Sequence, residues 1–102
     1  MMASESSFVS RAEKYELASE RWYKLFAHCG DEEDITILKE VQEGVEEALF
    51  VNYKELLMVT RDLQDIEGKY FSSPKVEKYA LNSLKYHLQA EAAKKAAKNE
   101  GE

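Results

Sequence analysis

The chain has 102 residues, of which 44% are hydrophobic and 33% charged, and its net charge at pH 7 is −6. These values are typical of a chain that folds into one small domain with a modest core. Four glycines and one proline are too few for the closely spaced turns of a β-sandwich or barrel. The acidic balance also disfavours a broad nucleic-acid-binding surface, which needs clustered cations. We therefore expect an all-α protein and do not expect nucleic acid as a partner.

The single cysteine, Cys29, cannot form an internal disulfide, and this is typical of a protein from a reducing compartment. No apolar run approaches the roughly 20 residues that a transmembrane helix needs. The first residues lack the basic start and apolar core of a secretion signal. We expect a cytoplasmic protein, with the nucleus as the alternative, and no membrane partner.

The first predicted helix covers about 8–29. Ser10 and Glu13 have the spacing of a capping box, and Gly30 is expected to end the helix. Residues 1–7 are expected to be disordered. Apolar side chains recur every three or four residues, which places them on one face. This face consists of Phe8, Ala12, Tyr15, Ala18, Trp22, Leu25 and Cys29.

Four residues, Asp31, Glu32, Glu33 and Asp34, lie between the first two predicted helices. At the start of a helix, free backbone amides and the helix dipole favour acidic side chains. We interpret the segment as a solvated helix cap. The alternative, a cation-binding loop, lacks the ligand spacing of an EF-hand calcium loop.

The second predicted helix is long, covers about 34–67 and is expected to end at Gly68. Over 48–59 it is apolar nearly all round, so more than one neighbour must cover it. Gly44 lies off its apolar face and weakens the helix by about 1 kcal/mol relative to alanine. The apolar face is close to a heptad pattern and consists of Leu38, Val41, Val45, Leu49, Asn52, Leu56, Val59, Leu63, Ile66 and Tyr70.

Asn52 interrupts this apolar face, and two interpretations are open. The side chain can be a partly hydrated residue at the edge of the bundle near Arg11, or a buried asparagine that fixes helix register. Four aromatic residues in the same region are assigned to the core rather than to a ligand pocket. These are Tyr15, Trp22, Phe50 and Tyr53.

The third predicted helix covers about 74–95, with Ser73 as its N-cap and Pro74 as its first residue. Its large apolar residues end at Leu88. The alanine- and lysine-rich remainder favours helix but has little to bury, and residues 99–102 are expected to fray.

The charges of the last two predicted helices favour an antiparallel arrangement. Residues 31–51 contain eight acids and one lysine, whereas residues 74–99 contain six lysines and two acids. A turn at 68–73 would bring these two segments together, and opposite charges stabilise that register by a few tenths of a kcal/mol per pair. The expected neighbours are Lys94, Lys95 and Lys98 beside Glu47, Glu46 and Glu43.

The predicted fold is a staggered antiparallel three-helix bundle with one long central helix, in a single domain over 8–98. The first and third helices both cover the middle of the central helix. Only the third helix is left to cover the apolar residues beyond Glu55. We therefore expect a partner-binding surface made of Leu56, Leu57, Met58, Val59, Leu63, Ile66, Tyr70 and Phe71.

This surface predicts a protein-interaction module, such as an adaptor, a chaperone-like factor or an assembly subunit. The expected partner is a helix of another protein or a second copy of the chain, with homodimerisation as one form. An alternative is that the acidic segment 31–51 makes the protein an inhibitor that occupies the basic site of a nucleic-acid-binding protein.

Catalytic motifs are scarce, and we expect no catalytic residue, no cofactor and no metal. The two histidines, His28 and His87, fall on different predicted helices and do not have the spacing of a zinc site. Arg21 and His28 resemble the Arg…His motif of HEPN-type helical ribonucleases. That resemblance implies phosphate contact by Arg21 and general-base catalysis by His28. It covers this motif alone, and Trp22 stands where the family usually has a polar residue.

Overall fold

The structure, a computed structural model, describes residues 3–48 and 52–101, with side chains at 10–48 and 52–98. The described residues form helices and no strand, so the all-α prediction is confirmed. Four helices are present in this described part of the chain: α1 (Ala3–Cys29), α2 (Glu32–Gly44), α3 (Tyr53–Glu67) and α4 (Pro74–Gly101).

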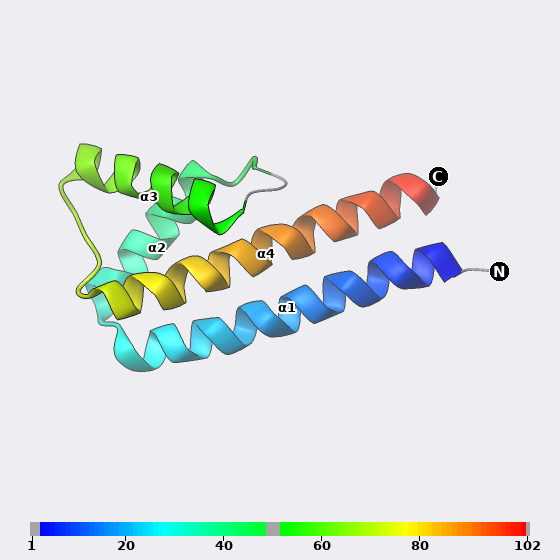
Figure 1. Cartoon of the computed structure of the whole chain (residues 1–102), viewed down its shortest axis with the longest axis horizontal. Coiled ribbons are helices and arrows are strands. Elements are labelled where there is room, and N and C mark those ends of the chain that lie inside the picture. The colour runs from blue at the N-terminus through cyan, green and yellow to red at the C-terminus, as the bar shows by residue number, and fades with distance from the viewer. Residues whose placement is uncertain (1–2, 49–51, 102) are drawn as a thin grey trace.

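A long pair and a short pair of helices make up the architecture (Figure 1). The long helices α1 and α4 run antiparallel, side by side, and make the most extensive contact between any two helices. The shorter helices α2 and α3 are also antiparallel and lie over one end of the long pair. Both described chain ends lie at the opposite end. The molecule is elongated, with extents of 50 × 26 × 19 Å.

The helix ends at Gly30, Gly68 and Pro74 follow the predicted caps, but the capping box predicted at Ser10 and Glu13 is wrong, because both residues lie inside α1. Two of the predicted helices are also longer in the structure. α1 begins at Ala3 and α4 reaches Gly101, so residues 3–7 and 99–101, expected to be disordered or frayed, are helical. Gly68 has φ 69°, a left-handed conformation that favours glycine at a helix end. The Ser73 hydroxyl oxygen accepts a hydrogen bond from the Val76 amide at 3.2 Å, and α4 starts at Pro74.

The prediction of one long central helix over 34–67 is wrong, because the chain forms two separate helices there, α2 and α3. α2 ends at Gly44, and Val45 caps it with φ −116° and ψ 10°. Asn52 then caps α3 from an extended conformation, and its side-chain oxygen accepts from the Glu55 amide at 2.9 Å. The interpretation of Asn52 as a buried, register-fixing residue is wrong, since its exposed side chain begins a helix. The Asn…Glu spacing is a capping signal that competes with the heptad pattern.

The break allows two short helices to contribute to one core. Val41 on α2 and Leu56 on α3 are both buried in the cluster that Leu81 and Leu84 of α4 join. In one straight helix over 34–67, most of either α2 or α3 would lie away from α1 and α4. Ala48 and Tyr53, predicted to lie in the core, pack against its edge, and Phe50 lies outside the described residues.

Small residues hold α1 against α4, which the three-helix prediction did not include. Ala12, Ser83, Ala90 and Ala93 are all buried, and the Ser19 hydroxyl donates to the Ser83 carbonyl at 2.9 Å. Short side chains let two helix backbones approach closely along a seam. The alanine-rich end of α4, expected to have little to bury, therefore packs on α1.

The face that α1 buries is rotated relative to the predicted one. Phe26 is fully buried and meets the Phe71 ring edge-on, with 6.3 Å between ring centroids. Leu25 and Cys29, predicted on the buried face, are exposed. Tyr15 and Trp22 are half-buried beside the seam, where they contact Tyr86 and Tyr79 of α4.

The predicted charge register between the acidic segment and the α4 lysines differs from the observed one. Lys94 forms ion pairs with Glu16 of α1 and Glu91 of its own helix. Figure 1 confirms the antiparallel turn between α3 and α4, but α1 rather than α2 lies against the lysine-rich end of α4. Lys94, Lys95 and Lys98 share only a surface hollow with Glu46.

A buried carboxylate ties two turns together at the end of the molecule where α2 begins. Asp34 is 1% exposed. Its carboxylate accepts hydrogen bonds from the Asp31 amide at 2.9 Å and from the Ser72 amide and hydroxyl at 2.8 and 2.7 Å. The Asp31 side chain in turn accepts a hydrogen bond from the Asp34 amide at 2.9 Å. The acidic segment is thus a helix cap as predicted, but Asp34 is not solvated.

Gly30 gives this carboxylate room. A Cβ atom there would lie 3.2 Å from the Asp34 Cβ and 3.0 Å from the Phe26 carbonyl oxygen. Burial by itself would raise the pKa of Asp34, but the hydrogen bonds from Asp31 and Ser72 outweigh it and hold the pKa below its ordinary value of 3.8.

Asp34→Asn should lower the free energy of unfolding at pH 7 by about 2 kcal/mol, because an amide group would face donors that now meet a charged acceptor. The depressed pKa means that the carboxylate stabilises the fold fully above pH 3.8 and progressively less as the pH falls through the native pKa. Urea unfolding from neutral to acidic pH should therefore show the wild type and variant converging. Glu33→Gln, an exposed change in the same turn, is the control. A constant difference across this range would contradict the assignment.

Candidate functional site

The partner surface predicted from sequence divides into buried and exposed parts. Leu56 and Phe71 belong to the core, and Leu57 and Leu63 are half-buried. The remaining four predicted residues are exposed: Met58, Val59, Ile66 and Tyr70.

The exposed apolar residues of α3 lie among acids. Ile66 is 79% and Met58 62% exposed, the two highest values among the large apolar side chains described. Helical spacing places Met58, Val59 and Ile66 on the outward side together with Glu55, Asp62 and Asp65. We call these six residues the α3 face. Tyr70 lies just beyond, where its hydroxyl donates to Asp65 at 2.5 Å, and this hydrogen bond raises the pKa of Tyr70.

The opposite side of α3 is buried but partly polar. Thr60 is 0% and Gln64 3% exposed. The Thr60 hydroxyl and both amide atoms of Gln64 have no hydrogen-bond partner in the described part of the chain. α3 buries Leu56 as expected, but it also turns two polar side chains inward and three apolar ones outward, which departs from the usual helix pattern at these positions.

Gln64 adjoins a crevice of about 70 Å³ between α2 and α3. Lys69 and Glu40 close its mouth with an ion pair at 3.3 Å. This space is on the scale of one or two water molecules, which can hydrogen-bond to an amide.

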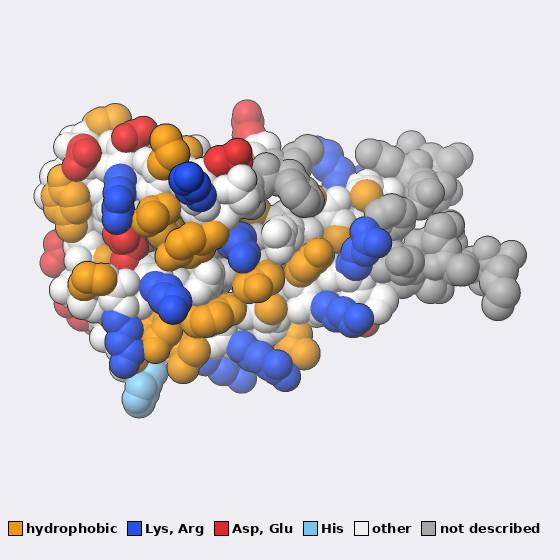
Figure 2. Space-filling view, viewed as in Figure 1, with side chains coloured by type: hydrophobic (Ala, Val, Ile, Leu, Met, Phe, Trp, Pro, Cys, Tyr) orange, Lys and Arg blue, Asp and Glu red, His pale blue; other side chains and the backbone are white. Residues whose placement is uncertain are grey.

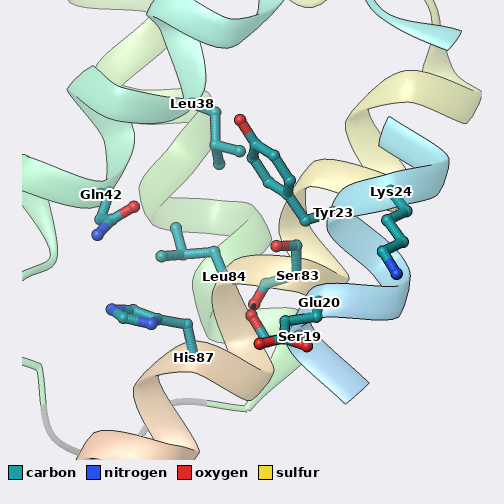
Figure 3. A pocket seen from close by; sticks show the side chains of 9 residues that line it. All are labelled: Ser19, Glu20, Tyr23, Lys24, Leu38, Gln42, Ser83, Leu84 and His87. Carbon is teal, nitrogen blue, oxygen red and sulfur yellow. Dashed lines mark hydrogen bonds between the residues drawn. The ribbon is translucent and has the colours of Figure 1, made fainter. Parts of the chain in front are cut away.

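A larger groove of about 310 Å³ lies where α1, α2 and α4 meet (Figure 3). Leu38 and Leu84 form its apolar wall. Figure 3 shows Tyr23 pointing toward Leu38, and Gln42 and His87 on the side away from α1. The remaining lining residues are Ser19, Glu20, Lys24 and Ser83.

The groove does not have the arrangement of a catalytic centre. The Ser19 hydroxyl donates to the Ser83 carbonyl, so it is not paired with His87 as a nucleophile would be with its base. A second hollow of about 450 Å³ shares Gln42 and His87 and continues along α4 past Leu88 to the lysines. Side chains of both charge signs line the two hollows.

Arg21 and His28 do not form a site with the groove. Both are exposed on α1, and neither lines the groove. His87 lines the groove but lies on α4. No group of three or more potential metal ligands lies close together in the described residues. Within the same residues, no helix combines the length and apolarity needed to cross a bilayer.

Sequence reasoning missed the groove and the exposed apolar residues of α1. Leu17 and Leu25 are 50% and 44% exposed. The signal for Leu17 was available, because it lies off the predicted apolar face. The prediction placed Leu25 on the buried face of the first helix because it did not identify the neighbouring Phe26 as the core residue. The groove depends on how α1, α2 and α4 meet, and the predicted three-helix arrangement did not include the contact between α1 and α4.

Comparisons with known proteins identify no relative. The chain matches no protein-family model, no curated protein and no solved structure.

Thr60→Val should raise the free energy of unfolding by about 1 kcal/mol, because valine has the same shape and removes a buried hydroxyl without a partner. Chemical denaturation measures the change. Thr36→Val is the matched control, since the Thr36 hydroxyl is exposed and donates to the Glu32 carbonyl at 3.1 Å; it should bring no gain. A loss of stability at Thr60 would show that its hydroxyl contributes a favourable interaction.

Proposed function

We propose that the protein is a helical interaction module that binds a partner helix through the α3 face. The observation that supports this is the orientation of α3, with Met58 and Ile66 outward and the unpartnered Thr60 and Gln64 inward. Covering Met58 and Ile66 would remove from water the most exposed apolar side chains described. An adaptor or an assembly subunit of the cytoplasm or nucleus fits this role.

The shape and charge of the α3 face indicate its partner. Met58 and Val59 precede Ile66 by about two turns, which suits docking of two helices along their axes. Glu55, Asp62 and Asp65 flank these residues, so the partner should carry cations beside apolar side chains.

A second candidate function rests on the acids of α2 and the following turn. Glu32, Glu33, Glu43, Glu46 and Glu47 are all exposed. Such a surface can occupy a basic site on a nucleic-acid-binding protein. Its complexes should dissociate steeply with salt, whereas complexes through Met58 and Ile66, in which charge pairs only flank apolar contacts, should weaken less.

Met58→Glu combined with Ile66→Glu should abolish partner binding while leaving the helical content unchanged, because both side chains are exposed. The measurement is a pull-down from cells of the source organism, quantified by mass spectrometry at low and high salt. Ala27→Glu with Thr36→Glu adds the same charge at exposed positions elsewhere and should retain the partner. Equal recovery with both double variants would rule out the α3 face.

A further inference from the structure

α1 carries an exposed stripe that no other helix covers. A shallow depression of about 500 Å³ is lined by Lys14, Leu17, Ala18, Arg21, Trp22 and Leu25. No acidic residue lines it. Half of the Leu17 surface is exposed, and neither cation forms an ion pair within the described residues. We call Lys14, Leu17, Ala18, Arg21 and Leu25 the α1 stripe.

The α1 stripe and the α3 face have the same spacing with opposite charges. In each helix a charged residue is followed by apolar residues three and four positions later, a second charge at seven and an apolar residue at eleven. On α1 the sequence is Lys14, Leu17, Ala18, Arg21 and Leu25. On α3 it is Glu55, Met58, Val59, Asp62 and Ile66.

We propose that the α3 face binds the α1 stripe of a second copy of this chain. This inference rests on the proposed function and names the partner. In a parallel alignment, Lys14 lies opposite Glu55 and Arg21 opposite Asp62, while the apolar residues between them meet. Both charges of each helix then find an opposite charge, and the exposed Leu25 and Ile66 cover one another.

The positions of the two surfaces make this association head to tail. In Figure 1, α1 and α3 lie on opposite sides of α4. Figure 2 shows Lys and Arg with apolar side chains over the long pair, and acids gathered toward the α2–α3 end. One copy therefore presents its α3 face to one neighbour and its α1 stripe to another, which produces chains or rings rather than a two-fold dimer.

The apolar residues of the α1 stripe favour a protein helix over other anionic partners. A nucleic acid strand would neutralise Lys14 and Arg21 but leave Leu17 and Leu25 in water. A membrane-surface helix needs a broader apolar face than these side chains provide. A single helix-to-helix contact falls below the roughly 1,000 Å² of a stable interface, so the association should be weak.

Sedimentation of the purified full chain up to about 1 mM tests the proposal in the range where small interfaces are populated. The mean mass of the wild type should rise with concentration and fall with added salt. Arg21→Glu and Asp62→Arg should each weaken self-association about tenfold or more, because each places like charges opposite one another. An equimolar mixture of the two variants should regain association, since the two reversed charges face each other in half of the contacts and the original pair meets in the other half.

Matched controls distinguish the loss of a specific contact from the effect of a changed net charge. Lys78→Glu and Glu43→Arg change the charge equally at exposed positions outside both surfaces and should associate like the wild type. A wild type that stays monomeric, or a mixture no better than its components, overturns the proposal. If Asp62→Arg weakens association but Arg21→Glu does not, the second-copy inference fails while the α3 face remains a binding surface. If neither matters and Met58→Glu with Ile66→Glu keeps its partner, the proposed function fails as well.

Discussion

The fold depends on the carboxylate of Asp34, which joins two turns that are far apart in the sequence. By accepting from Asp31 and from both donors of Ser72, it fixes where α2 leaves α1 and where α4 begins. The long pair can pack only if these turns keep α1 and α4 side by side. A buried carboxylate is tolerated because each contact to it is a hydrogen bond to its charged form, whose strength increases away from water. Removal of one donor would leave a buried charge short of partners.

The second constraint is the break between α2 and α3, which shows how local chemistry overrides periodicity. The apolar heptad pattern through this region is compatible with one helix, and Gly44 alone would not stop it. Gly44 instead marks close packing, since a Cβ atom there would lie 2.7 Å from a Leu63 methyl carbon. Asn52 begins the next helix by capping α3. Folding back brings Val41 and Leu56 into one core, which outweighs the helical hydrogen bonds lost at the turn.

The features that could be predicted from sequence are those that depend on interactions between neighbouring residues. The ends at Gly30, Gly68 and Pro74 depend on a few neighbouring residues, and the prediction placed them correctly. The α1–α4 seam depends on Ala12, Ser83 and Ala90, whose small side chains give little hydrophobic signal. These small residues stabilise the fold only when two helices pack closely together. A search for large apolar residues therefore missed the contact between α1 and α4. On α1, the three- and four-residue spacing chosen for the apolar face placed Leu25 inside and left Phe26 out.

For the proposed binding surface, the prediction grouped residues of α3 without the rotation that the helix has in the structure. The prediction treated residues from Leu56 to Ile66 as one surface, whereas α3 buries Leu56 and exposes Ile66. Thr60 and Gln64 face inward because they lie on the side of α3 that buries Leu56. A sequence selected for stability alone would place apolar residues there and polar ones outside. Where local residue choice conflicts with burial, function is the usual cause. The conflict on α3 therefore supports a role for its outward face, and the matching spacing on α1 gives that face a chemically complementary partner within the same chain.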